Sequence, residues 1–207
     1  MGAAPRLGSC AEGSMKHVSS IDILHHAYTV VTDDEYLDNM QGRWEPATAR
    51  ILESLAYGTV LDVGANIGMT TLLHSRLADQ VHAFEPSPTT FALLEENVAT
   101  AACDNVVLHN FGLGQAPGAF ELTYSPNNRS GAYVSDKVQA SEGHTTETIQ
   151  IDTMDGFVAS GGTRDVDVIK VDVEGFELNV LRGGAQTLAR YRPAVVLEMN
   201  QDRKSVV

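Results

Sequence analysis

The stretch "TVLDVGANIGMTTLL", residues 59–73, contains an aspartate and two glycines that could bind a charged ligand. Asp62 lies within an apolar run, and Gly64 and Gly68 follow where a helical pattern begins. Without a Cβ atom these glycines allow a sharp turn and a close approach to a ligand, and the start of the helix offers unpaired amide donors. A dinucleotide site would need the spacing GxGxxG. Asn66 stands at the third position of that pattern and the Asp62 carboxylate would repel a pyrophosphate, so the loop favours a ligand with a cationic part.

A second acidic group, Glu85, ends the next apolar run in "VHAFEPSP", 17 residues after Gly68. In a strand–helix–strand unit, an acid at this point is placed to accept hydrogen bonds from both hydroxyls of a ribose. S-adenosylmethionine meets both demands, because its ribose suits Glu85 while its ammonium and sulfonium suit Asp62 and the loop carbonyls. The alternative is a merely structural turn, since a glycine turn near an acid is common in α/β folds.

A third acidic group lies in "IKVDVEGFELNVLRGG", residues 169–184, where Asp172 and Glu174 end a predicted buried strand. The carboxyl ends of parallel strands meet at one edge of a sheet, so we expect these two carboxylates to share a crevice with Asp62 and Glu85. Methyl transfer needs two aligned partners and a group that takes a proton from the acceptor. Asp172 is the first candidate for that group, as general base or as orienter of the acceptor, and Glu174 is the second.

The carboxylates at this edge have an alternative role as ligands of a divalent cation. Asp172, Glu198 and Asn200 would then supply hard oxygen ligands. The preferred interpretation is a site without a metal ion.

The elements that position these residues follow from alternating patterns. Short apolar runs are separated by helix-like segments, which predicts crossover units and a mostly parallel α/β sheet. The runs are "TVLDV", "VHAFE", "VVLHNF", "DVIKVDV" and "AVVLEM". A predicted helix begins at Pro46 and stops at Gly58, directly before the glycine loop, and Ser87 is the expected cap of a later helix.

Residues 112–165 do not follow this alternation of apolar runs and helix-like segments. "GAFELTY" and "HTTETIQI" are interpreted as two extra strands. The stretch between them, "SPNNRSGAYVSDK", is rich in turn-forming residues and is interpreted as a mobile flap or as a plain surface loop. The predicted organisation is an N-terminal extension over residues 1–45, partly disordered or helical, followed by one domain over residues 46–207.

The chain resembles the FkbM-type S-adenosylmethionine-dependent methyltransferases. The resemblance rests on "VLDVGANIGMTTL", "VHAFEPSP", "DVIKVDVEGFELNVLRGG" and "RPAVVLEMN" and spans about residues 44–200. It implies a Rossmann-like, doubly wound class I methyltransferase that acts on an oxygen of a small molecule or sugar. It also implies which residues bind the cofactor: Asp62, Gly64, Ala65, Asn66 and Gly68 at the methionine end, and Glu85 and Pro86 at the ribose.

Two other functions remain open. One is an NAD-linked or nucleotide-sugar oxidoreductase, which the missing middle glycine and Asp62 disfavour. The other is a non-catalytic remnant that binds the cofactor or a partner. Only "QDRKSVV" follows "VVLEMN", whereas this architecture normally adds two more strands, so the sheet edge would be uncovered. Either the chain is a shortened form, or a second copy in a homodimer or the strands of residues 117–151 protect that edge.

The charge and hydropathy of the sequence restrict which kinds of partner the protein is expected to bind. The formal net charge is -13, and no cluster of lysine or arginine is present, so nucleic acid is not an expected partner. No run approaches the roughly 20 apolar residues of a membrane helix, and the first residues do not form a secretory signal. The expected location is the cytoplasm, and the expected partner is a small-molecule methyl acceptor.

Overall fold

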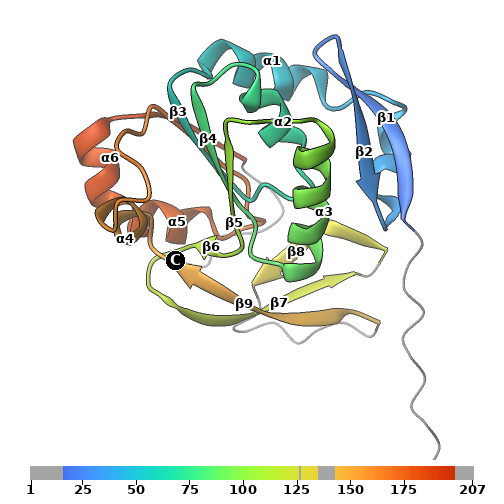
Figure 1. The fold of residues 1–207 in the computed structure, drawn as a ribbon. Helices are drawn as coiled ribbons and strands as arrows, with labels where there is room; N and C mark the ends of the chain where they lie inside the picture. Colours follow the sequence, from blue (N-terminus) through green and yellow to red (C-terminus); the bar gives the residue numbers. More distant parts are fainter. Residues whose placement is uncertain (1–15, 126, 135–142, 199–207) are drawn as a thin grey trace, which may run out of the picture.

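Five parallel strands form the central sheet of the computed structural model, which describes residues 16–125, 127–134 and 143–198 (Figure 1). Their order across the sheet is β11-β10-β3-β4-β5, and every pairing is parallel. The strands are β3 (Thr59–Val63), β4 (Gln80–Phe84), β5 (Val106–His109), β10 (Val168–Val171) and β11 (Ala194–Leu197). Each coincides with one of the apolar runs, which confirms the mostly parallel sheet. The strand order reverses between β3 and β10, and the crevice at such a reversal is where ligands bind in α/β sheets.

Helices cover both faces of this sheet, as a doubly wound fold requires (Figure 1). On one face lie α1 (Pro46–Leu55), α2 (Met69–Ser75) and α3 (Pro88–Thr100). On the other lie α4 (Met154–Ala159), α5 (Glu177–Gly183) and α6 (Ala185–Tyr191). The helix predicted from Pro46 is confirmed, although it ends at Leu55, before Gly58. The Ser87 hydroxyl caps α3 by accepting from the Thr90 amide, as expected.

A β-hairpin precedes the sheet. It consists of β1 (His17–Ile23) and β2 (His26–Thr32), and a 3-10 helix, η1 (Glu35–Met40), follows it. The prediction of a partly disordered or helical extension over residues 1–45 did not include these two strands. Ile21, Ile23 and Val30 alternate with polar residues and are buried at 1%, 0% and 0% exposure against α2 and α3. Alternation of this kind is the pattern of a half-buried strand.

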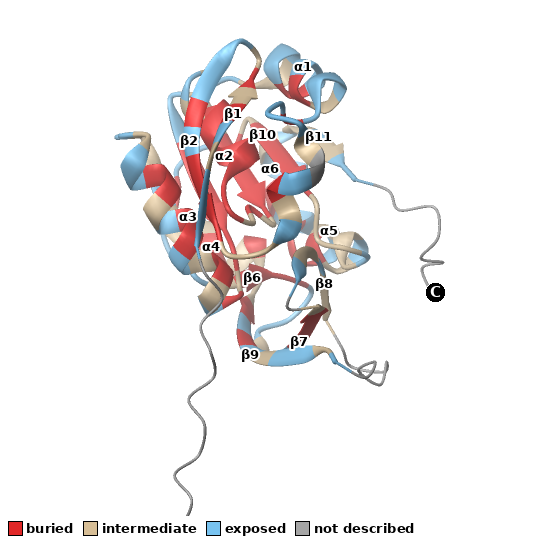
Figure 2. Ribbon diagram, turned by 90° about the vertical axis from the view of Figure 1, so that its right-hand side faces the viewer, coloured by how far each residue is buried: buried red, intermediate tan, exposed pale blue. Residues whose placement is uncertain are grey.

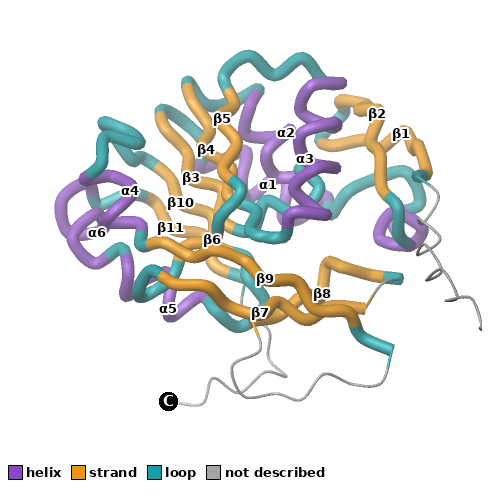
Figure 3. The backbone as a smooth tube through the Cα atoms, turned by 60° about the horizontal axis from the view of Figure 1, so that its bottom comes forward, coloured by secondary structure: helices purple, strands orange, loops and turns teal. Residues whose placement is uncertain are grey.

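A second sheet lies below the carboxyl ends of the parallel strands (Figure 3). It contains, in spatial order, β6 (Gly112–Leu113), β9 (Thr145–Asp152), β7 (Gly118–Ser125) and β8 (Asn128–Val134). The two predicted extra strands are β7 and β9. The predicted flap is wrong over residues 128–134, because this segment is a strand that pairs antiparallel with β7. The remainder of the predicted flap beyond Val134 lies outside the described residues.

The buried residues concentrate in the parallel strands and the inner faces of their helices (Figure 2). At one edge, Val195 and Leu197 of β11 are 39% and 36% exposed. Within the described residues no strand pairs with the outer side of β11, and the strands of residues 117–151 belong to the second sheet. In the same part of the chain, every helix is too short or too polar to cross a bilayer.

Candidate active site

The glycine loop is held tightly between two strands. Gly64 and Gly68 have φ angles of 78° and 108°, in the region that favours glycine. A Cβ atom on Gly64 would lie 1.9 Å from the Asp172 carbonyl oxygen. On the other side, the amides of Gly64 and Ala65 both donate to the Phe84 carbonyl at 3.0 Å. The loop therefore has the predicted sharp turn, and its close backbone contact is with Asp172.

Asp62 lies in β3, two residues before Gly64, and its side chain contacts α2. Its carboxylate is 0% exposed and accepts hydrogen bonds from the hydroxyls of Thr70 and Thr71, each at 2.7 Å. Burial alone would raise the pKa of Asp62, but Lys170, together with His74 and the two hydroxyls, holds it below its usual value. Asp62 lines neither of the cavities described below. The expectation that its carboxylate shares the rim of the crevice is therefore wrong, because the side chain points into the protein.

Lys170, which the sequence reasoning missed, is the partner of Asp62. The Lys170 side chain is 6% exposed, and its ammonium lies 3.2 Å from Asp62 and 3.7 Å from Asp172. It also donates a hydrogen bond of 2.7 Å to the Gly64 carbonyl. Burial would lower the pKa of Lys170, but Asp62 and Asp172 raise it, so the side chain remains an ammonium. The available signal was a lone lysine inside the apolar run "DVIKVDV", since a buried lysine is rarely unpaired.

Glu85 follows β4 on the opposite side of the loop. It is 7% exposed, and its two carboxylate oxygens accept from the amides of Asn66 at 3.0 Å and Ser87 at 2.9 Å. Burial raises the pKa of Glu85 to about 7, although these two amides oppose the shift. Glu85 and Pro86 both line the first cavity. The side chain thus occupies the position that the sequence assigned to it.

Asp172 and Glu174 follow β10 and also line the first cavity, together with Glu198, which follows β11. Each of these three residues offers one carboxylate oxygen within 4.8 Å of the others. A hydrogen bond to Asp172 is the main cause that raises the pKa of Glu198 to about 8, and burial adds to it. Glu198 therefore retains its proton near neutral pH, beside the Asp172 carboxyl group. Asn200, named with them as a metal ligand, lies outside the described residues.

Two cavities adjoin at these acids. The first, of about 250 Å³, lies between the glycine loop and the second sheet, and the second, of about 310 Å³, lies between the loop and α1. Six residues line both cavities, and we call them the junction: Tyr36, Glu45, Gly64, Asn66, Asp172 and Glu198. Two ligands that meet at the junction would bring their reacting atoms beside Asp172.

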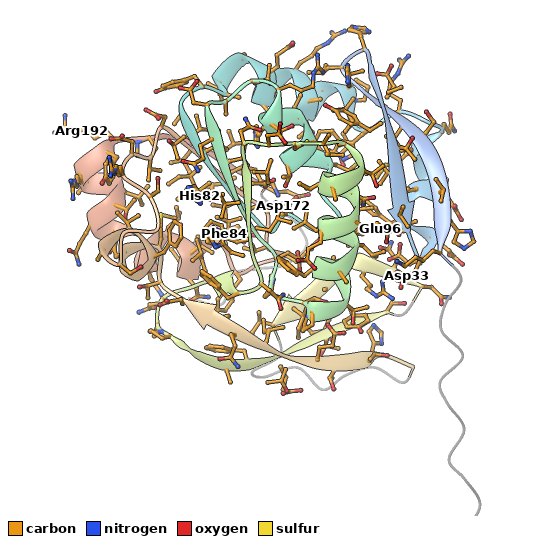
Figure 4. The ribbon with its side chains drawn as sticks, in the orientation of Figure 1. Asp33, His82, Phe84, Glu96, Asp172 and Arg192 are labelled. Carbon is orange, nitrogen blue, oxygen red and sulfur yellow. The ribbon has the colours of Figure 1, made fainter. Side chains whose placement is uncertain are left out.

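Tyr36 and Arg129 reach the site from segments without a recognisable pattern. Burial raises the pKa of the Tyr36 phenol, so η1 brings a neutral hydroxyl to the junction. The Arg129 guanidinium forms an ion pair with both carboxylate oxygens of Asp33, and the Arg129 amide donates to Asp34 at 2.9 Å. Figure 4 shows Asp33 where the hairpin meets the second sheet. Arg129 thus ties β8 to the segment that carries Tyr36.

Comparisons with known proteins agree with this architecture. A family model described as "Methyltransferase FkbM domain" matches residues 62–206. "Hexuronic acid methyltransferase AglP" of Haloferax volcanii is 38% identical over 139 residues, which cover 67% of this chain and 55% of that protein. "Methyltransferase 1" of Beauveria bassiana is 33% identical over 142 residues, which cover 60% of this chain and 57% of that protein.

A more distant relative, "2-O-methyltransferase NoeI" of Sinorhizobium fredii, is 27% identical over 149 residues, which cover 64% of this chain and 60% of that protein. The chain thus spans somewhat more than half the length of these relatives. The crystal structure of Methyltransferase FkbM from Methylobacillus flagellatus KT superposes with a TM-score of 0.50 at 16% identity, over 69% of this chain and 34% of that chain. At this identity the superposition shows the fold alone.

Proposed function

Because the chain belongs to the FkbM methyltransferase family, we propose that it binds S-adenosylmethionine and transfers the methyl group to a hydroxyl oxygen of a small molecule or sugar. One observation carries this proposal: Glu85 and Asp172 lie on the wall of one cavity, on either side of a loop with no room for a Cβ atom at Gly64. That arrangement offers a carboxylate for a ribose at one end and a carboxylate for a reacting hydroxyl at the other.

The residues present fit the cofactor. Both oxygens of Glu85 already accept one amide hydrogen bond, and each retains a lone pair for a ribose hydroxyl. Gly112 and Leu113 line the same cavity beside Pro86 and offer an apolar wall to a base. The acidic side chains at the junction favour a cationic centre there. In this assignment the nucleoside lies in the first cavity and the acceptor enters through the second.

The cofactor supplies the reactive methyl group, so the protein has to align the acceptor with it and remove the acceptor's proton. S-adenosylmethionine supplies, when bound, a methyl group attached to a positively charged sulfur. Asp172 orients the acceptor hydroxyl in line with that methyl group and accepts its proton as the new carbon–oxygen bond forms and the carbon–sulfur bond breaks. Glu198, whose pKa is raised to about 8 mainly by a hydrogen bond to Asp172, holds the Asp172 carboxyl group in place at the cavity wall. Glu174, on the same wall, is the second candidate for the role of base.

The names of two relatives support an oxygen acceptor on a sugar. One is called a hexuronic acid methyltransferase and the other a 2-O-methyltransferase. The junction itself carries Glu45, Asp172 and Glu198, which suits a neutral hydroxyl better than an anion. A small-molecule acceptor rather than nucleic acid also agrees with the net charge of -13.

The proposal is tested by calorimetric titration with S-adenosylmethionine, S-adenosylhomocysteine and NAD, and by transfer of a labelled methyl group to a panel of neutral sugars and uronic acids. Binding of the first two ligands and labelling of a neutral sugar support the proposal. Binding of NAD alone would support the oxidoreductase instead. Cofactor binding without label transfer to any sugar would point to the non-catalytic alternative. Pairing of two copies along the edge of β11 remains a prediction, which sedimentation velocity would test.

A further inference from the structure

Lys170 makes more contacts than charge neutralisation requires. Its ammonium has three donors, and the structure gives it three oxygen partners, on Gly64, Asp62 and Asp172. Asp62 alone would balance the charge, since it is fully buried beside the ammonium. Nevertheless, the shortest of the three contacts, 2.7 Å, goes to the uncharged Gly64 carbonyl. This pattern indicates a role in geometry as well as in charge.

The Gly64 carbonyl belongs to a loop whose first three amides are bound from the side of β4. The amides of Gly64 and Ala65 donate to the Phe84 carbonyl of β4, and the Asn66 amide donates to Glu85, which follows β4. Lys170 binds the same loop from the opposite strand, β10. The loop is therefore fixed at both sides of the crevice where the strand order reverses.

Asp172 is the second group that Lys170 holds. Its side chain is 39% exposed at the cavity wall, so packing alone leaves it room to rotate. The ammonium at 3.7 Å restrains the carboxylate on the side of the glycine loop. One cation thus contacts both the loop expected to receive the cofactor and the carboxylate expected to receive the acceptor proton.

We infer that Lys170 is a positioning residue, which fixes the Gly64 carbonyl and the Asp172 carboxylate relative to each other across β3 and β10. This inference rests on the proposed function, because it assigns Lys170 a part in binding the cofactor. The competing explanation is that Lys170 only neutralises the buried Asp62. The two explanations differ in what happens when both charges are removed together.

The test is a charge-balanced pair of substitutions, Lys170→Met with Asp62→Asn. Denaturant unfolding and titration with S-adenosylhomocysteine are measured for this double variant, for each single variant and for the wild type. Lys170→Met alone leaves a buried carboxylate unpaired and is expected to be strongly destabilised. The double variant is expected to regain most of the lost stability but to bind S-adenosylhomocysteine about tenfold more weakly than Asp62→Asn alone, because the Gly64 carbonyl is no longer fixed.

Two controls complete the experiment. Lys16→Met removes a lysine whose side chain is 58% exposed and should leave both stability and affinity unchanged. Lys170→Arg keeps the cation beside Asp62 and is expected to fold, but its planar guanidinium cannot reproduce the three contacts, so affinity should again fall about tenfold.

The outcomes separate the two proposals. If the double variant and Lys170→Arg bind as tightly as their references, Lys170 only neutralises Asp62 and the inference is wrong. If the wild type itself binds no S-adenosylhomocysteine, the proposed function fails, and the role assigned to Lys170 fails with it.

Discussion

At the scale of single residues, the site consists of carboxylates whose environments differ. Asp62 is buried and paired with a lysine, Glu85 is buried against two amides, and Asp172 lies at a cavity wall beside a protonated partner. The same functional group therefore occupies three different environments, and we expect a different purpose of each. Each purpose can be tested by a substitution that removes only one of them.

Glu85 and Asp172 should affect different steps. Replacing Glu85 with alanine removes the acceptor for the ribose hydroxyls and should weaken S-adenosylmethionine binding by about tenfold or more, in line with the loss of hydrogen bonds to a charged group. Asp172→Ala should leave cofactor affinity nearly unchanged and reduce turnover by about 100-fold or more. Titration calorimetry and a labelled-methyl assay measure the two effects. The reverse pattern would show that the two roles are exchanged.

Glu85 should also make stability depend on pH. Its pKa rises from 4.5 to about 7 on folding, so the folded state holds this proton more tightly than the unfolded state. The contribution to stability is complete below about pH 4.5 and is lost as pH rises through about 7, with a total of about 3 kcal/mol. The difference in unfolding free energy between the wild type and Glu85→Gln should therefore decline over that interval.

Denaturant unfolding at several pH values measures this decline. Groups that are common to both proteins contribute equally to both, so their contributions cancel in the difference. Glu53→Gln, at an exposed position of α1, serves as the control and should follow the wild type. A constant difference between wild type and Glu85→Gln from pH 4.5 to 7 would contradict the assigned environment of Glu85.

At the scale of elements, β8 and η1 act together because Arg129 joins them. The side chains of Arg129 and Asp33 are 10% and 16% exposed, so their ion pair is shielded from solvent. A double-mutant cycle with Arg129→Gln and Asp33→Asn should give a coupling energy of about 1 to 3 kcal/mol. Faster hydrogen exchange in residues 128–134 and 35–40 should accompany each single substitution. A coupling energy near zero would mean that the two elements are held independently of this pair.

Much of the element order was predictable from the sequence, and the exceptions have physical reasons. The five parallel strands are nearly continuous apolar runs, which a sheet covered on both faces produces. The strand at Asn128–Val134 was missed because turn-forming residues occur in it, and its pairing with β7 depends on contacts distant in sequence. The N-terminal hairpin was missed although its alternation of Ile21, Ile23 and Val30 was visible.

The site was predictable in part. Glu85 and Asp172 were placed correctly because parallel strands end at one edge, which is a property of topology. Asp62 was misplaced because it lies within β3 and not after it, and its side chain pairs with Lys170 of the neighbouring strand. Tyr36 and Arg129 reach the site through tertiary contacts of η1 and β8, so neither segment carried a local signal.

At the scale of the whole molecule, the two adjoining cavities suit a reaction between two bound molecules, and we expect this reaction to need no metal ion. Asp172, Glu174 and Glu198 bring carboxylate oxygens within 4.8 Å of one another, close enough for a divalent cation, but the proposed reaction needs only a base at Asp172. Treatment with EDTA should therefore leave methyl transfer unchanged, as measured by the labelled-methyl assay. Loss of activity that magnesium or calcium restores would show instead that Asp172, Glu174 and Glu198 bind a cation.

The most direct test of the account is a crystal structure of the chain with S-adenosylhomocysteine. We expect the ribose hydroxyls to bind Glu85, the base to lie beside Pro86 in the first cavity, and the sulfur to face Asp172 at the junction. Density for the ligand at any other place, or a ribose that does not touch Glu85, would contradict this expectation.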